Sequence, residues 1–147
     1  MNHSYFVLRP DQHEAALNVV GTQVTVLASN AVTQSYGVTL QQGDEGTGPP
    51  PHSHDWDECF YVLKGGVEFL CEGRSHLCLA GTLVHVPRGT VHGFQYGLGG
   101  GQMLELTGQG ALAAQMFDAV DKEIPAGPPD IPKLLAVLSR NGVTVAV

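Results

Sequence analysis

Apolar and polar residues alternate along most of the chain between residues 5 and 107. In residues 24–26 and 36–40 the alternation has the two-residue period of a strand with one buried face. The same criteria predict further strands at residues 59–63, 67–70, 75–79, 83–86, 91–96 and 102–106. Many short strands at this spacing predict an all-β sandwich or barrel.

Glycine and proline mark the ends of these predicted strands. Lys64-Gly65-Gly66 is predicted as a hairpin turn that joins residues 59–63 to residues 67–70. Other turn signals lie at residues 72–73, 80–81, 87–89 and 97–101. The chain contains 19 Gly and 9 Pro, a density that suits short strands joined by tight turns.

The pattern changes to a helical one after residue 107. Three apolar residues recur at helical spacing and predict a helix over residues 111–122: Leu112, Met116 and Val120. A stretch rich in Pro and Gly at residues 124–129 breaks the chain, and Asp130 is placed to cap a second helix that ends at Asn141-Gly142. The apolar stripe of this second helix consists of Ile131, Leu134, Leu135 and Leu138.

The two predicted helices and the β-prone residues 143–147 form a tail of about forty residues, too few to bury a core of their own. We therefore expect one domain over residues 1–147. It would consist of a barrel at about residues 5–107 and a helical tail at about residues 111–147 that covers the barrel or an interface.

Charge and cysteine content narrow the class of protein. The formal net charge is −7, with only seven Lys and Arg and no basic cluster, which argues against binding to nucleic acid or to an anionic membrane. No apolar run is long enough to cross a bilayer, and residues 1–10 do not resemble a signal peptide. Three cysteines without a C-x-x-C pair predict free thiols and a cytoplasmic protein.

The residues suited to chemistry gather in the middle of the chain. His52, His54 and Glu58 all occupy even positions, so an extended strand would project them from one face. Two imidazoles and a carboxylate that converge on one point outline a site for a first-row transition metal, and His92 is the candidate for a third imidazole.

These residues resemble the two sequence motifs of the cupin superfamily. The first motif, G-x5-H-x-H-x3-E-x6-G, matches at Gly46, His52, His54, Glu58 and Gly65. The second, G-x5-P-x-G-x2-H-x3-N, matches at Gly81, Pro87, Gly89 and His92, with Tyr96 in place of the motif Asn. The helical tail and the residues around the first motif also look like those of small bacterial quercetin-dioxygenase-like cupins.

The resemblance, which covers about residues 38–106, implies a cupin double-stranded β-helix, or jelly-roll barrel. Near its centre His52, His54, Glu58 and His92 would hold one divalent transition metal: Fe, Mn, Ni, Cu or Zn. It further implies a metal-dependent dioxygenase acting on a small aromatic or enol-like molecule, with Glu58 as ligand and general base. Two alternatives stay open: a non-catalytic module that binds a small molecule, and a metal-dependent isomerase or decarboxylase. A homodimer is expected.

Aromatic residues near the motifs are candidates for a substrate pocket. Phe94 and Tyr96 share the parity of His92, and Phe60 shares that of Glu58, although ordinary barrel core explains all three equally well. The remaining histidines lie outside the motifs and are expected at or near the surface: His3, His13, His76 and His85.

Overall fold

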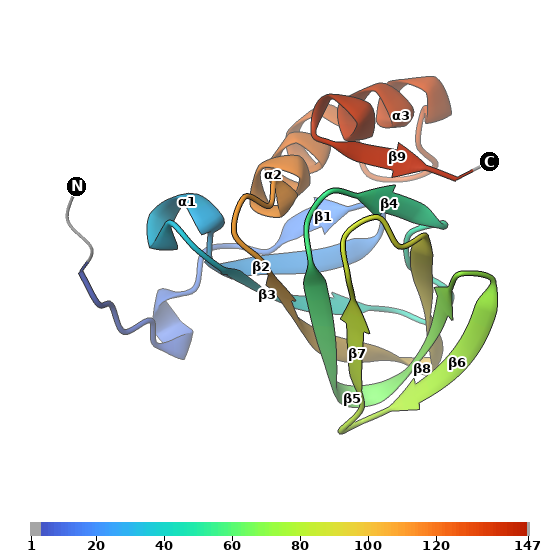
Figure 1. Ribbon diagram of the computed structural model, residues 1–147, viewed down its shortest axis with the longest axis horizontal. Helices are drawn as coiled ribbons and strands as arrows, with labels where there is room; N and C mark the ends of the chain where they lie inside the picture. The colour runs from blue at the N-terminus through green and yellow to red at the C-terminus, as the bar shows by residue number, and fades with distance from the viewer. Residues whose placement is uncertain (1–3, 147) are drawn as a thin grey trace.

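A curled sheet of nine strands, covered at one end by helices, makes up the fold in a computed structural model that describes residues 4–146 (Figure 1). The strands are β1 Leu17–Val19, β2 Thr22–Ala28, β3 Gly37–Gly43, β4 His52–His54, β5 Glu58–Cys71, β6 Arg74–Leu79, β7 Leu83–Val86, β8 His92–Thr107 and β9 Val143–Val145. The α-helices are α1 Asn30–Thr33, α2 Ala113–Glu123 and α3 Ile131–Arg140. Pro10–Gln12 form a short 3-10 turn.

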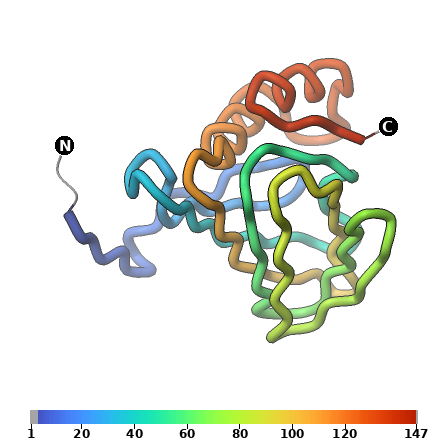
Figure 2. Tube along the Cα trace, viewed as in Figure 1, coloured from blue at the N-terminus to red at the C-terminus, as the bar shows by residue number. Residues whose placement is uncertain are grey.

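Every strand pair is antiparallel, and the order in the sheet is β1-β2-β3-β8-β4-β9, with β5 paired to β6, β7 and β8. The sheet curls on itself, and α2 and α3 lie over one end of it (Figure 2). The prediction of an all-β barrel with helices at the C-terminus is confirmed.

Strands β5 and β8 are longer than predicted, because each runs through a glycine-rich segment instead of ending there. The prediction of a hairpin turn at Lys64-Gly65-Gly66 is wrong: β5 continues from Glu58 to Cys71 and stays paired with β8. Gly65 takes a φ of +71°, and a Cβ there would lie 2.2 Å from the carbonyl oxygen of Gly100. The predicted turn at residues 97–101 likewise lies inside β8. The glycines bend the paired strands without separating them.

The bends also change which residues face inward. Shifts of register in the β5–β8 ladder fall between Val62 and Lys64 and between Gly65 and Val67. Before the bend the even positions of β5 are buried, and after it the odd positions Val67 and Phe69 are buried. One extra residue in a ladder reverses the inward parity of everything beyond it.

Two hydrophobic clusters fill the interior. The barrel cluster consists of Phe60, Val62, Val67, Phe69, Cys78, Val86, Phe94, Tyr96 and Met103. The helix-side cluster consists of Val24, Trp56, Ala111, Ala113, Met116, Phe117, Val120, Ile124, Val137 and Val143. The second cluster joins α2 and α3 to the first strands of the sheet, so the tail closes the open end of the barrel.

The helical tail forms much as its sequence predicts. The side chain of Asp130 accepts a hydrogen bond from the backbone N–H of Lys133 and caps α3, whose C-cap is Asn141. The β-prone tail forms β9, which pairs with β4, while Val147 lies outside the described residues. The strand β1 and the helix α1 were not predicted, because three or four residues carry too little periodicity.

The cysteines and outlying histidines lie where they were expected. Cys59 and Cys71 are half-buried, Cys78 is buried, and all three thiols are free. The side chains of His13, His76 and His85 are exposed, and His3 lies outside the described residues. Within residues 4–146 no helix is long and apolar enough to cross a membrane.

Candidate metal centre

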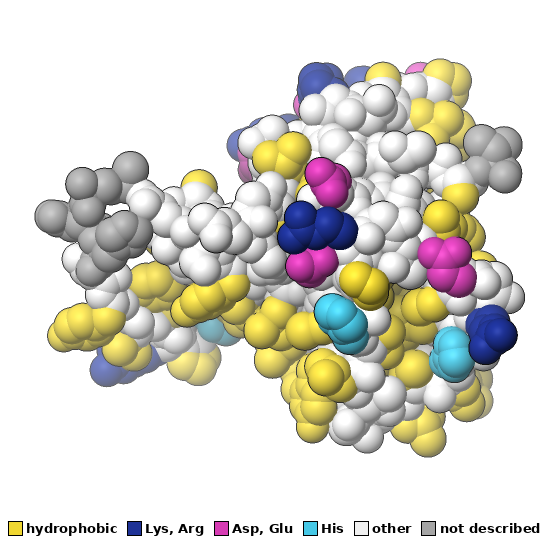
Figure 3. Space-filling model, in the orientation of Figure 1, with side chains coloured by type: hydrophobic (Ala, Val, Ile, Leu, Met, Phe, Trp, Pro, Cys, Tyr) yellow, Lys and Arg dark blue, Asp and Glu magenta, His cyan; other side chains and the backbone are white. Residues whose placement is uncertain are grey.

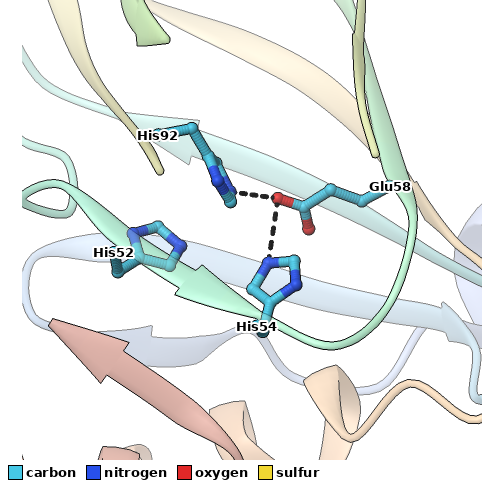
Figure 4. A group of neighbouring side chains, drawn as sticks. All are labelled: His52, His54, Glu58 and His92. Carbon is cyan, nitrogen blue, oxygen red and sulfur yellow. Dashed lines mark hydrogen bonds and ion pairs between the residues drawn. The ribbon is translucent and has the colours of Figure 1, made fainter. Parts of the chain in front are cut away.

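Three imidazoles and one carboxylate converge beneath the helices at the open end of the barrel (Figure 4). His52 and His54 come from β4, Glu58 begins β5, and His92 begins β8. One nitrogen or oxygen from each of the four side chains lies within 4.8 Å of the others. The structure therefore brings together all four residues that the sequence singled out.

The topology explains how residues so far apart in sequence meet. His52 and His92 are direct ladder partners in β4 and β8. Glu58 and His92, by contrast, lie at opposite ends of the β5–β8 pair, because His92 is the partner of Cys71. The bend in the pair folds these two ends toward each other across the barrel mouth, so that His92 Nε2 and Glu58 Oε1 are 2.6 Å apart.

Each imidazole is oriented by a backbone carbonyl. The Nδ1 atoms of His52, His54 and His92 lie 2.9, 3.1 and 2.8 Å from the carbonyl oxygens of Pro50, Trp56 and Thr90, respectively. A neutral imidazole whose Nδ1–H donates to a carbonyl has a free electron pair on Nε2, which is the arrangement found behind metal-ligating histidines. The rings thus present Nε2 to the centre of the cluster.

The pKa values of the cluster reflect its crowding. Burial alone would raise the pKa of Glu58, but hydrogen bonds from His54 and His92 lower it to about 2, so the group stays a carboxylate. Burial, together with the neighbouring His92, lowers the pKa of His52 to about 4 and keeps that imidazole neutral. Burial alone would also lower the pKa of His92, but its hydrogen bond with Glu58 raises it above the ordinary value.

This donor set fits a divalent first-row metal. Metal–ligand bonds of about 2.1 Å hold neighbouring ligand atoms about 3 Å apart, and the four atoms here lie within 4.8 Å of one another. Imidazole nitrogens with one carboxylate suit Fe, Mn, Ni, Cu or Zn. Strands rather than flexible loops hold all four ligands.

The sequence of residues 38–103 matches the family model described as a cupin domain. Residues 38–103 form a cupin domain. Quercetin 2,3-dioxygenase from Bacillus subtilis (strain 168) is 32% identical over 93 residues, which span 61% of this chain but only 27% of that protein. The chain thus matches about a quarter of the length of this curated relative.

Solved structures share the fold at low sequence identity. KdgF from Halomonas sp. superposes with a TM-score of 0.66 at 21% identity, covering 72% of this chain and 94% of that one. A sugar phosphate isomerase of the cupin superfamily from Silicibacter pomeroyi gives a TM-score of 0.62 at 19% identity, covering 69% of this chain and 74% of that one. Such identities establish the fold and leave the activity open.

A cavity of about 230 Å³ runs from the candidate metal-binding residues to the helical tail. Three aromatic residues were predicted to line a substrate pocket, and two of them, Phe60 and Phe94, lie in the lining of this cavity. Tyr96 packs beside Phe94 with ring centroids 5.6 Å apart and is not among the described residues that line the cavity. It belongs to the barrel cluster, and burial raises the pKa of its hydroxyl.

A second buried carboxylate, which the sequence did not predict, lines the same cavity. Glu105 is 3% exposed and accepts a hydrogen bond of 3.0 Å from the hydroxyl of Thr39, which also accepts one from the amide of Gln41. Burial raises the pKa of Glu105 well above its ordinary value, and the nearby charge of Glu58 raises it further. The sequence did show a single acidic residue among the apolar residues 103–106. If β8 were regular, however, Glu105 would face away from His92, because the two differ in parity. The bend in β8 reverses this and turns Glu105 inward.

The residues beside the ligands hold the two motif segments together. The indole of Trp56 stacks on the His54 ring, with centroids 4.1 Å apart and planes 7° from parallel. The backbone N–H of Gly89 donates to the carbonyl of His54 at 2.9 Å, and that of Arg88 donates to the Asp57 carboxylate at the same distance. The turn before β8 is thereby attached to the segment between β4 and β5, which fixes the approach of His92 to Glu58.

Proposed function

We propose that this protein is a metal-dependent oxidoreductase, and more specifically a dioxygenase that acts on a small aromatic or enol-like molecule. His52, His54, Glu58 and His92 would hold one Fe, Mn, Ni, Cu or Zn ion. The observation that supports the proposal most is the set of three carbonyl-anchored imidazoles and one ionised carboxylate at the polar end of an otherwise apolar cavity. The match to quercetin 2,3-dioxygenase supports the reaction class.

An ion held by these four side chains would leave coordination positions free and would supply Lewis-acid chemistry at a substrate oxygen. The chain's own residues supply the rest. Glu58 stays ionised as a ligand, and we assign it the further role of general base on leaving the ion. Phe60 and Phe94 line the cavity beside the ligands and limit the access of water to the site.

The test is oxygen consumption by protein reconstituted separately with Fe(II), Mn(II), Ni(II) and Cu(II), offered a panel of enols, catechols and flavonols. The expected result is substrate-dependent uptake of O₂ and incorporation of both atoms of ¹⁸O₂ into product. The double variant His52→Ala/His54→Ala should lose this activity, whereas His85→Ala, an exposed histidine on β7, should keep it. Equal conversion with and without oxygen would contradict the dioxygenase assignment.

The same site supports two rival functions. A metal-dependent isomerase or decarboxylase would use the same residues and convert its substrate equally well without oxygen; one solved structure with this fold is a sugar phosphate isomerase. A non-catalytic binding module would instead raise its melting temperature with ligand and form no product. Product analysis under nitrogen, combined with thermal-shift measurements, separates the three functions.

We also propose that the protein is a homodimer, because the outer face of the barrel is apolar. Tyr61 on β5 lies between Leu83 on β7 and Leu104 on β8, and the next residue in this row is Leu40 on β3. Tyr61 and Leu83 are 41% and 61% exposed, and Figure 3 shows hydrophobic side chains gathered over β5 and β7. A solvated sheet face normally carries polar residues, so this one suits a second copy.

Light scattering tests the dimer, which has twice the chain mass of 15.5 kDa. Tyr61→Lys should shift the protein to the monomer, whereas Glu68→Lys, an exposed position beyond the β5 bend, should not. A monomeric wild type at tens of micromolar would contradict the proposal.

We further propose a domain organisation, a location and a class of partner for this chain. One domain is supported by the helix-side cluster, in which α2 and α3 pack against the sheet. A cytoplasmic location is supported by three free thiols, since such thiols persist in a reducing compartment. The expected partner is a small molecule, because the acidic chain lacks the basic surface that nucleic acid or an anionic membrane requires.

A further inference from the structure

The cavity beside the metal ligands has two ends of different chemistry. Polar side chains gather at the barrel end: Gln41, His52, His54, Glu58 and Glu105. The other lining residues are mainly apolar, and α2 and α3 contribute eight of them. A ligand that fills this space therefore meets oxygen- and nitrogen-bearing groups at one end and hydrocarbon at the other.

The apolar end is built by the helical tail, which lies outside the matched cupin domain. Helix α2 contributes Ala113, Met116, Phe117 and Val120 to the cavity lining, and α3 contributes Ile131, Leu134, Leu135 and Leu138. The family match ends at residue 103, before either helix begins. The barrel thus supplies the metal ligands, whereas the tail supplies the surface that touches the rest of a ligand.

The cavity is open to solvent beside the helical tail. Ile131 and Leu135 line the cavity and are nevertheless 54% and 42% exposed, so the cavity reaches solvent beside α3. Apolar side chains at an opening favour the entry of an apolar group rather than a charged one. The charged or chelating part of a ligand would then occupy the far, polar end.

The volume limits the size of the apolar part. An apolar cavity of about 150 Å³ holds one benzene molecule, and this cavity measures about 230 Å³. One six-membered ring and a few further heavy atoms therefore fill it. Quercetin, with three rings, exceeds this space unless α3 moves away from the barrel.

We propose that α2 and α3 form the specificity-determining half of the substrate site, and that the substrate is a single-ring molecule whose oxygen-bearing head chelates the metal while its ring lies against the helices. The proposal rests on the proposed metal centre but not on the oxygen reaction. It narrows the substrate class to compact, amphipathic chelators such as one-ring enols, hydroxy-ketones or catechols.

The test uses hydroxamic acids, which chelate divalent metals through two oxygens and can carry any tail. Zinc-loaded protein is titrated calorimetrically with acetohydroxamic acid, benzohydroxamic acid and 4-phenylbenzohydroxamic acid, in parallel with a measurement of bound zinc. Burial of one ring should make benzohydroxamic acid bind about tenfold to a hundredfold tighter than the methyl compound. The second ring should add no affinity, because the cavity has no room for it.

A matched pair of variants on α3 locates the ring. Leu134→Trp fills the cavity and should remove the preference for benzohydroxamic acid while leaving acetohydroxamic acid and zinc bound. Ala136→Trp places the same side chain on the exposed face of the helix and should change neither. The comparison of ligands on wild type needs no variant, so a folding defect in Leu134→Trp does not affect the conclusion.

The outcomes distinguish failure of the helix-lined substrate site from failure of the proposed metal centre. Equal affinity of zinc-loaded wild type for the methyl and phenyl compounds, or much tighter binding of the two-ring compound, would overturn the single-ring, helix-lined site alone. Protein that takes up no zinc and binds none of the three compounds would overturn the metal centre and this proposal together. Selective binding of the one-ring compound without oxygen chemistry would support this proposal while the dioxygenase assignment failed.

Discussion

The barrel cluster and the helix-side cluster are both apolar, but the first packs mainly against itself whereas the second borders the cavity. The side chains of the barrel cluster pack mostly on one another, and Val62, Val67, Phe69 and Met103 are fully buried. In the helix-side cluster, Met116, Phe117 and Val120 face the cavity on one side. The first cluster holds strands rigidly beneath the metal ligands, and the second leaves a space above them. The same hydrophobic residue types thus serve as scaffold in one region and as binding surface in the other.

Substitution of two methionines, one in each cluster, tests this difference in packing directly. Met103→Ala in the barrel cluster should lower the free energy of unfolding by about 4 kcal/mol, because it opens a void in close-packed surroundings. Met116→Ala, whose side chain already borders the cavity, should cost about 2 kcal/mol. Urea denaturation of both variants without metal gives the values, and equal costs would show that the two regions are packed alike.

Substitution of the glycine at the barrel bend should lower the free energy of unfolding nearly as much as substitution in the barrel cluster. Gly65→Ala should cost about 3 kcal/mol, because it adds a Cβ 2.2 Å from a carbonyl oxygen at a φ of +71°. Gly73→Ala, at a φ of +78° with no atom within 4 Å of the added Cβ, isolates the backbone strain and should cost about 1 kcal/mol. Thermal or urea unfolding of the pair tests this, and a Gly65→Ala variant as stable as Gly73→Ala would contradict the bend as described.

Acid should weaken metal binding, by a free energy smaller than the changes in stability above. The hydrogen bond with Glu58 holds the pKa of His92 above its ordinary value in the metal-free protein, so the ring binds its proton more tightly than a free imidazole and must release it to coordinate. Affinity should therefore fall as pH falls through this pKa, by up to about tenfold per pH unit for this proton. His52 has a pKa of about 4, so its protonation should compete with metal binding only at a much lower pH.

Competition against a chelator of known affinity, repeated from pH 8 to pH 5, measures this dependence. His85→Ala should give the wild-type profile, since that ring lies outside the site. An affinity unchanged between pH 8 and pH 6 would mean that His92 does not ligate the metal.

The same contrast explains which features the sequence could predict. His52, His54 and Glu58 share even positions within seven residues, and this parity was enough to group them. The prediction that one extended strand carries all three is wrong, because His52 and His54 lie on β4 whereas Glu58 begins β5 after an irregular segment at residues 55–57. His92 needed the second motif, because only the resemblance connects it to the first. The strands of the barrel cluster were also largely predicted, since each alternates with a period of two.

Features that depend on two distant segments were missed or wrong. Gly65 and the glycine-rich residues 97–101 were interpreted as turns, because a glycine that bends a paired strand and one that ends a strand look the same in sequence. Glu105 was missed for the related reason that the bend reverses its parity. The docking of α2 and α3 over the metal ligands depends on tertiary contacts that no local pattern specifies.

The most direct test of the metal centre is elemental analysis by inductively coupled plasma mass spectrometry. It compares freshly purified wild type with His52→Ala/His54→Ala, and with His85→Ala as the control for loss of an unrelated histidine. The account predicts close to one divalent transition metal per chain in wild type and control, and none in the double variant. Metal retained by the double variant, or a wild type that takes up none even after reconstitution, would contradict it.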